Sequence, residues 1–257
     1  MRAKKSYGQH FLTNEHFAQQ IAQSLVLTDQ YDHVLEVGPG RGMLTKYLLE
    51  RTGDFQLKVV EADRDMVSYL EANYPQLTED IIAEDFMKIW PQQHFEGSFG
   101  LIGNYPYNIS SQILIRTVEW RKQVPEMVGM FQKEVADRAA AGPGSKTYGT
   151  VGVIVQAYYD VEMCFKVGPG NFNPPPKVQS AVIRLVRKAE PLVPDEQFKA
   201  FRQIVKAAFG QRRKMLRNSL KSVFPAEEIK GEFFQRRPEQ VSVAEFAALA
   251  NRLNVLK

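Results

Sequence analysis

Short apolar runs alternate with helix-like segments through the first two thirds of the 257-residue chain. The runs carry few polar residues, a pattern typical of strands that are buried on both faces of a parallel sheet. They lie at 33–38, 56–61, 80–85, 99–104 and 127–132. The alternation therefore predicts an α/β fold built on a mainly parallel sheet.

Three segments between these runs place apolar residues at helical spacing, so each can cover one face of the sheet. They are 43–51, 64–74 and 110–120. A further helix is predicted around 150–158, followed by strand-like runs at 158–167 and 178–188. Because a proline-rich loop separates these two runs, we interpret them as a late antiparallel pair at the edge of the sheet.

The pattern changes after Lys188. The stretch "AEPLVPDEQ" supplies two prolines and is typical of a linker, and the residues beyond it have helical periodicity. Ser242 and Glu245 have the spacing of a capping box at the start of the last helix. We therefore predict two domains, an α/β domain over 1–188 and a small all-helical domain over 189–257.

The composition is that of an ordinary globular protein, with 44% hydrophobic and 24% charged residues. No apolar run approaches the roughly 20 residues that a membrane span needs, and "MRAKKSYGQHFL" lacks the apolar core of a signal peptide. We expect a cytoplasmic protein without a membrane partner or a metal site. The single cysteine, Cys164, lies in a strand-like run, where we expect it to pack in the core.

Basic residues are concentrated in one segment, although the net charge is only +4. Residues 201–221 hold seven basic side chains and no acidic one: Arg202, Lys206, Arg212, Arg213, Lys214, Arg217 and Lys221. The N-terminus adds Arg2, Lys4 and Lys5. This concentration favours a polyanionic ligand over the alternative, a solvated helix face.

The stretch "VLEVGPGRGMLTKYL" is typical of a strand, a glycine-rich turn and a helix. Gly38, Gly40 and Gly42 permit a sharp turn and a close approach of the backbone to a nucleotide-like ligand. A dinucleotide-binding turn would have glycine at position 43, where this chain has Met43. The G-x-G-x-G pattern is instead associated with S-adenosylmethionine (AdoMet) methyltransferases, and the alternative is a tight turn without a ligand.

Two carboxylates follow the next strands of the predicted sheet. Glu61 ends the second strand, where it can accept hydrogen bonds from both ribose hydroxyls, and Asp85 ends the third, where it can accept from an adenine amine. Strand ends are common places for solvated acidic residues, so each alone says little. Together with Gly38 they predict a row of ligand-binding groups along the carboxyl edge of the sheet.

The fourth strand ends in Asn104, Tyr105, Pro106 and Tyr107, which match the Asp/Asn-Pro-Pro-Tyr/Phe-like motif of methyltransferases that modify an exocyclic amine. The Asn104 side-chain oxygen and the Tyr105 carbonyl can each accept a hydrogen bond from one N–H of the amine. Pro106 fixes φ, and the Tyr107 ring can stack on the base. The Tyr105 ring is not needed, so leucine should replace it. The alternative is a strand-ending turn with both rings in the core.

Phe172 stands beside Pro174, Pro175 and Pro176 in "GNFNPPPKVQSAV". We expect an exposed ring on this stiff loop to complete a stacking sandwich around the target base, with a hydrophobic plug as the alternative. Because N6 lies on the base-pairing edge of adenine, a base held in this way must leave its helix or come from a single-stranded loop.

Motifs along nearly the whole chain resemble those of the rRNA adenine N6-methyltransferase family, and of its small-subunit rRNA dimethyltransferases in particular. They include "KKSYGQHFL", "VLEVGPGRGMLT", "AEDFM", "GNYPYNIS", "AGPGSKTYG", "NFNPPPKVQSAVIRL" and "AFGQRRKMLRNSL". The resemblance implies a Rossmann-like class I AdoMet methyltransferase sheet with a helical RNA-binding domain. It also implies dimethylation of N6 on two adjacent adenosines in a hairpin near the 3′ end of small-subunit rRNA.

The resemblance further implies roles for individual residues. The positions that match the family's AdoMet contacts are His10, Leu12, Gly38, Glu61, Asp85 and Asn104. Those that match its target-base contacts are Asn104, Tyr107 and Phe172. RNA phosphates are expected at Arg212, Arg213, Lys214 and Arg217. Position 10 departs from the usual asparagine and position 105 from the usual leucine.

The expected partner is a pre-30S ribosomal particle, bound by a monomer. Three other functions stay open on the sequence. The first is the same chemistry on large-subunit rRNA, as in macrolide-resistance methyltransferases. The second is a non-catalytic RNA-binding assembly factor, and the third is an NAD-dependent oxidoreductase, which Met43 disfavours.

Overall fold

The computed structural model describes residues 10–51 and 53–255, so Arg2, Lys4 and Lys5 lie outside the described residues. The chain separates into two compact units, each described here by itself. The first comprises Met1–Ala136 and Val161–Arg187, and the second comprises Asp137–Asp160 and Lys188–Lys257. One boundary between the two units lies between Arg187 and Lys188, close to the domain boundary expected at 188. Residues 137–160, which were expected in the first domain, group with the C-terminal helices instead.

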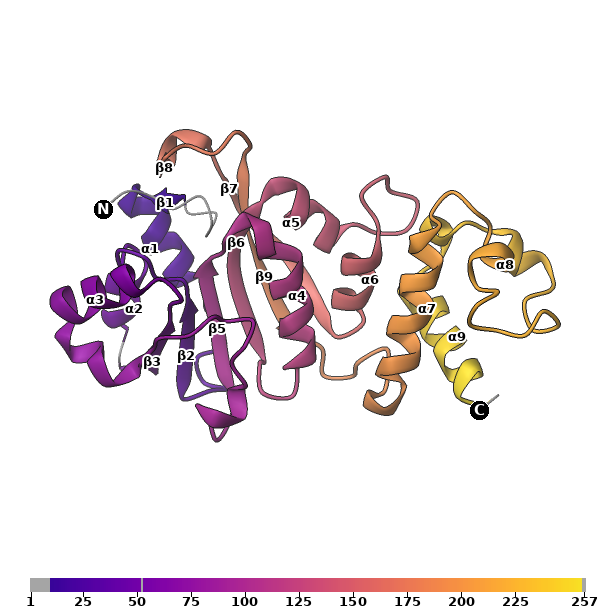
Figure 1. Ribbon diagram of the computed structural model, residues 1–257, viewed down its shortest axis with the longest axis horizontal. Helices are drawn as coiled ribbons and strands as arrows, with labels where there is room; N and C mark the ends of the chain where they lie inside the picture. Colours follow the sequence, from indigo (N-terminus) through magenta and orange to yellow (C-terminus); the bar gives the residue numbers. More distant parts are fainter. Residues whose placement is uncertain (1–9, 52, 256–257) are drawn as a thin grey trace. The chain divides into compact units, whose positions relative to one another are not determined.

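A seven-stranded sheet forms the first unit, with strand order β4-β3-β2-β5-β6-β9-β7. Its strands are β2 (His33–Val37), β3 (Gln56–Val60), β4 (Ile81–Ile82), β5 (Phe99–Asn104), β6 (Glu126–Gln132), β7 (Tyr159–Val167) and β9 (Ser180–Arg187). The first five pair in parallel, and β9 runs antiparallel to β6. The predicted parallel sheet is confirmed, and β7 and β9 are neighbours at its edge as expected (Figure 1).

Helices cover this sheet: α1 (Glu15–Gln23), α2 (Thr45–Leu49), α3 (Arg64–Asn73) and α4 (Ser110–Glu119). A further helix, α5 (Lys133–Ala140), begins in the first unit and ends in the second. In Figure 1, α4 crosses in front of the strands around β6, which it contacts. The sequence analysis did not identify α1, which begins after Asn14. The Asn14 Oδ1 atom accepts a hydrogen bond from the His16 N–H at 3.0 Å and so caps the helix.

A two-stranded ribbon joins the N-terminal segment to the proline-rich loop. It consists of β1 (Phe11–Leu12) and β8 (Phe172–Asn173), which pair antiparallel with Leu12 opposite Phe172. The Thr13 N–H donates to the Asn171 carbonyl at 2.9 Å, and Asn14 Nδ2 donates to Asn171 Oδ1 at 2.8 Å. These contacts span about 160 positions, so no local pattern in the sequence predicts them.

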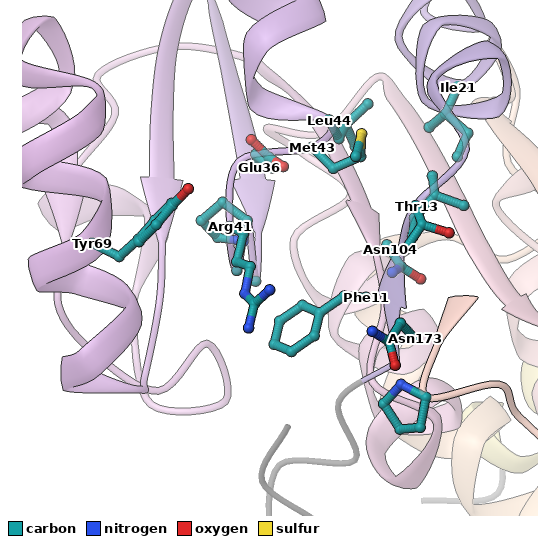
Figure 2. A pocket seen from close by; sticks show the side chains of 15 residues that line it. Phe11, Thr13, Ile21, Glu36, Arg41, Met43, Leu44, Tyr69, Asn104 and Asn173 are labelled. Carbon is teal, nitrogen blue, oxygen red and sulfur yellow. The ribbon is translucent and has the colours of Figure 1, made fainter. Parts of the chain in front are cut away.

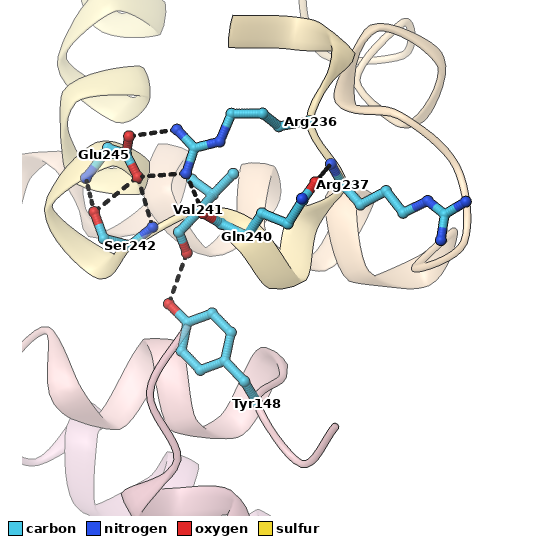
Figure 3. Close-up of polar contacts among 7 residues, drawn as sticks. All are labelled: Tyr148, Arg236, Arg237, Gln240, Val241, Ser242 and Glu245. Carbon is cyan, nitrogen blue, oxygen red and sulfur yellow. Dashed lines mark hydrogen bonds and ion pairs between the residues drawn. The ribbon is translucent and has the colours of Figure 1, made fainter. Parts of the chain in front are cut away.

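The second unit is helical and contains α6 (Thr150–Gln156), α7 (Phe198–Gly210), α8 (Leu216–Ser219) and α9 (Val243–Val255). The predicted capping box is confirmed. The Ser242 N–H donates to Glu245 Oε2 at 2.7 Å, and the Glu245 N–H donates to Ser242 Oγ at 3.2 Å (Figure 3). Arg236 also forms an ion pair with the Glu245 carboxylate, and this pairing lowers the pKa of Glu245.

Tyr148 explains why residues 137–160 belong to the helical unit. Its hydroxyl donates to the Val241 carbonyl at 2.9 Å (Figure 3). Its ring packs edge-on against Phe209. Because the side chain is fully buried, these contacts form part of the core of that unit. The "AGPGSKTYG" motif is therefore anchored to the helices rather than to the sheet.

Cys164 packs against the main apolar core while remaining half-buried, and burial raises the pKa of its thiol. Within the described part of the chain, no helix is long and apolar enough to cross a membrane. The same residues contain no group of three or more His, Cys, Asp or Glu side chains placed to hold a metal ion.

Gly129 leaves the space that the Tyr105 ring fills at the end of β5. A Cβ atom at Gly129 would lie 2.1 Å from Tyr105 Cε2 and 2.8 Å from the Phe131 ring. Gly129→Ala should therefore lower the free energy of unfolding by about 1–3 kcal/mol, measured by urea denaturation. Gly97→Ala, where a Cβ meets nothing within 4 Å, is the matched control.

A double-mutant cycle tests the cause of this loss. Tyr105→Leu removes the ring that the new Cβ atom would meet, so it should cost less stability in the Gly129→Ala background than in the wild-type protein. Strictly additive losses would show that the Tyr105 ring does not determine the need for glycine at position 129.

Candidate functional site

The carboxyl ends of the parallel strands meet at one edge of the sheet, where two adjoining cavities lie. One cavity, of about 290 Å³, is lined by the predicted residues His10, Gly38, Glu61, Asp85, Asn104 and Tyr107. The other, of about 580 Å³, includes Leu12 and Glu36 and is shown in Figure 2. Gly38 and Asn104 line both cavities, so the turn after β2 and the end of β5 separate them.

The glycine-rich turn has the backbone that its sequence predicts. Gly38, Gly40 and Gly42 have φ values of +65°, +56° and +77°, a region that side chains with a Cβ rarely adopt. A Cβ atom at Gly42 would also lie 2.4 Å from the Tyr74 ring. The turn therefore brings main-chain atoms directly to the cavity wall, as a bound nucleoside requires.

Glu61 ties the end of β3 to this turn. Its side chain is 7% exposed, with Oε2 accepting from the Gly40 N–H at 3.2 Å and Oε1 from the Asp63 N–H at 2.9 Å. Burial raises the pKa of Glu61, and the two backbone donors counteract this effect. A carboxylate oxygen can accept two hydrogen bonds, so both oxygens retain capacity for hydroxyl donors in the cavity.

Asp85 lies in the loop that follows β4 and lines the smaller cavity. Its Oδ1 atom accepts a hydrogen bond from the Met87 N–H at 2.9 Å, which fixes the carboxylate. The side chain is half-buried and lines the cavity together with Phe86. A carboxylate beside an aromatic ring suits a purine amine, because the ring can pack on the base while the carboxylate accepts a hydrogen bond from an N–H of the amine.

Asn104 is oriented by the backbone of His10. The amide Nδ2 atom donates to the His10 carbonyl at 3.0 Å. A carbonyl can only accept, so the nitrogen of the amide must face it, and Oδ1 must point the other way. Asn104 lines both cavities, and its Oδ1 atom is not used in this bond, so it can serve as an acceptor, the group that an exocyclic amine needs.

The two tyrosines of the motif have different surroundings. The Tyr105 ring is 1% exposed and stacks on Phe131 at 4.9 Å, so it is a core side chain. Tyr107 is half-buried, and its hydroxyl lies 2.5 Å from Ser180 Oγ. Burial raises the pKa of Tyr107, and Ser180 partly offsets this increase. Pro106 has φ −58°, the value that its ring imposes.

The expected exposure of Phe172 is wrong. Its side chain is 4% exposed and belongs to the main apolar core, where it lies opposite Leu12 in the β1–β8 ribbon. Among the described residues that line the two cavities, the loop contributes Asn173 and Pro174 instead. The role of Phe172 in stacking on the target base remains a prediction, and it requires the Phe172 ring to leave the core.

The sequence analysis missed three residues that line the larger cavity. Figure 2 shows Phe11 beside Arg41, whose guanidinium carbon lies 5.0 Å from the centre of the ring. Glu36 is fully buried, and its Oε2 atom accepts from the Thr45 hydroxyl at 2.7 Å. Burial raises the pKa of Glu36 to about 8. A charged residue inside the apolar run "HVLEVG" was the signal that could have identified it.

The basic residues of the second unit divide into two groups. Arg213, Lys214 and Arg217 are exposed. Arg212 is half-buried and donates to the Tyr148 carbonyl at 2.6 Å and the Ser145 carbonyl at 3.1 Å. It therefore braces the 142–149 loop. It also lines a cavity of about 290 Å³ with Arg138 and Lys146.

The sheet order, the glycine turn and the row of acceptors define the class of Rossmann-like class I methyltransferases. Two solved structures have this fold. A dimethyladenosine transferase from Plasmodium falciparum aligns with a TM-score of 0.77 at 23% identity, covering 96% of this chain and 98% of that chain. The 23S rRNA methyltransferase ErmE aligns with a TM-score of 0.67 at 25% identity, covering 95% and 99%.

The chain belongs to the ribosomal RNA adenine dimethylase family, whose model matches residues 1–254. It is 49% identical to the ribosomal RNA small subunit methyltransferase A of Flavobacterium johnsoniae, covering 98% of this chain and 96% of that protein. The protein of the same name from Cytophaga hutchinsonii is 47% identical, with coverages of 99% and 98%. The protein is therefore an enzyme of this methyltransferase family.

Glu36 should make the stability of the protein depend on pH. Its pKa in the folded state, about 8, lies above the ordinary value of 4.5, so between these values the folded state holds a proton that the unfolded state releases. The free energy of unfolding should therefore fall as the pH rises. Between pH 6 and pH 8 the free energy of unfolding of Glu36→Gln should fall by about 2 kcal/mol less than that of the wild-type protein.

Urea denaturation of the wild-type protein and the variant at both pH values measures this difference. Glu50→Gln, which changes an exposed carboxylate, should follow the wild-type curve. Parallel curves for wild type and Glu36→Gln would contradict a protonated Glu36 in the folded protein.

Proposed function

We propose that the protein uses AdoMet to dimethylate N6 of two adjacent adenosines in a hairpin near the 3′ end of small-subunit rRNA. The observation that carries this proposal is the single cavity in which Gly38, Glu61, Asp85 and Asn104 meet beside Tyr107. Family membership supports the chemistry, and the names of the relatives support the substrate.

The residues present fit the cofactor. Glu61 would hold the ribose hydroxyls and Asp85 the adenine amine, while the positive-φ turn at Gly38 and Gly40 would admit the nucleoside close to the backbone. Leu12 and Glu36 in the adjoining cavity would face the amino-acid end. When bound, AdoMet supplies an electrophilic methyl group on a sulfonium.

The chain contributes positioning rather than a strong base. Asn104 Oδ1 and the Tyr105 carbonyl would each accept a hydrogen bond from one N–H of the target amine. These two bonds would turn the lone pair of the amine nitrogen toward the cofactor. As positive charge develops on the nitrogen, these oxygens stabilise it, and Tyr107 adds the negative face of its ring. The tie between Asn104 Nδ2 and His10 keeps the acceptor oriented throughout.

Small-subunit rRNA is favoured over large-subunit rRNA as the substrate. The two relatives described above carry small-subunit names at 47–49% identity, whereas ErmE, a 23S rRNA enzyme, shares 25%. We infer that the protein acts in the cytoplasm as a monomer on a pre-30S particle. Arg213, Lys214 and Arg217, which are exposed on the helical unit, would contact RNA phosphates.

Methyl transfer tests the function directly. With labelled AdoMet and small-subunit particles from an unmethylated strain, the label should appear in N6,N6-dimethyladenosine. Asn104→Ala should lower kcat at least about 100-fold, because the acceptor for the amine is lost, while binding of the particle persists. The absence of transfer by the wild-type protein would refute the function. Full activity of Asn104→Ala would refute only the role of Asn104.

The salt dependence of RNA binding tests the division among the basic residues. Arg213→Gln and Lys214→Gln should each reduce the slope of log K against log salt by roughly 0.7–0.9, since each removes one phosphate contact. Arg212→Gln should instead lower the free energy of unfolding by about 1–3 kcal/mol, because it frees two main-chain carbonyls. Binding titrations and urea denaturation separate these effects.

Lys166→Gln, at an exposed lysine of the first unit, is the charge-matched control for this comparison and should leave the slope unchanged. If Arg213→Gln and Lys214→Gln also leave it unchanged, the RNA surface lies elsewhere on the protein.

A further inference from the structure

The imidazole of His10 lies on the ring of Tyr107. The two ring centres are 5.2 Å apart with an angle of 28° between the planes, which is a stacked arrangement. His10 Nδ1 is also 2.8 Å from the Pro174 carbonyl, and because the carbonyl can only accept, this nitrogen carries the proton. One stacking contact and one hydrogen bond therefore hold the ring over Tyr107.

The face of its ring is the part of Tyr107 that can stack on a ligand. Its hydroxyl is paired with Ser180, a residue that is fully buried at the start of β9, so the phenol is fixed at that end. Phe172 cannot contribute a second ring as it stands, because its side chain is in the apolar core. The aromatic group that actually faces Tyr107 in the cavity is His10.

We propose that the His10 imidazole occupies the place of the target adenine, and that the entering base displaces it from Tyr107. This inference rests on the proposed function. A rotation of the His10 side chain is sufficient, because the contact with Asn104 uses the main-chain carbonyl of His10 and not its ring. The acceptor for the amine therefore stays oriented while the stacking partner changes.

The exchange makes His10 a residue that selects the base. An adenine has two fused rings and covers more of Tyr107 than an imidazole does, so its stacking can replace both contacts of His10. A pyrimidine has one ring and gains less from the same exchange. His10 should therefore weaken the binding of every base and discriminate most strongly against the small ones.

The first test follows the ring itself. The chain has four histidines, so ¹H–¹³C NMR can resolve the His10 ring signals, which Tyr107 should shift upfield. With the cofactor site filled by S-adenosylhomocysteine, adenosine 5′-monophosphate should move these signals toward ordinary values, and cytidine 5′-monophosphate should move them less. Unchanged His10 signals in a protein that binds the adenine nucleotide would overturn the proposal.

The second test uses His10→Asn, which removes the aromatic ring but retains a donor for the Pro174 carbonyl. The variant should lower the KM for unmethylated small-subunit particles by roughly two- to tenfold at saturating AdoMet, the range of aromatic pair energies. The change should disappear in a Tyr107→Leu background, where the ring has no stacking partner. His16→Asn, at an exposed histidine on α1, should behave as wild type.

An unchanged or increased KM for His10→Asn would show that the imidazole supports binding and does not compete with the base. That result is distinct from failure of the proposed function, in which the wild-type protein itself transfers no methyl group to the particle. Measuring the Kd of AdoMet for His10→Asn separates any direct contact with the cofactor from the effect on the base.

Discussion

Parallel hydrogen bonding among β2, β3, β4 and β5 is the constraint on which the site depends. Because these strands run in the same direction, the residues that follow them emerge at one edge of the sheet. A glycine turn, two carboxylates and an amide that are far apart in the chain thereby line one cavity. The buried contact of Tyr105 with Gly129 fixes the end of β5, so the last member of this row is held by the core itself.

The N-terminal segment completes this edge from outside the sheet. Its pairing with β8 and the contacts of Thr13 and Asn14 with Asn171 hold it beside the end of β5. From there the His10 backbone orients Asn104, while its ring covers Tyr107. One short segment thus orients the side chain proposed to accept the amine and covers the ring proposed to stack on the base. The chemistry of the site depends on a contact that ties the N-terminal segment to the proline-rich loop.

The helical unit shows a similar division between support and binding. The Arg212 guanidinium donates hydrogen bonds to two main-chain carbonyls and so stabilises the loop that Tyr148 anchors. Arg213 and Lys214, in contrast, are exposed to solvent. A run of like charges in the sequence therefore does not have one function. The arginine that donates to main-chain carbonyls stabilises the unit, and its exposed neighbours are those proposed to attract a polyanion.

The sequence by itself determined the parallel sheet, the turn at Gly38 and the order of acceptors at its edge, because strand periodicity and strand-end position are local properties of the chain. Only the tertiary structure decided that Phe172 is buried, that His10 lies on Tyr107 and that Glu36 lines a cavity. Side-chain direction and burial depend on which distant segments pack together. The pairing of β1 with β8 joins residues about 160 positions apart, and no local pattern of residues encodes that contact.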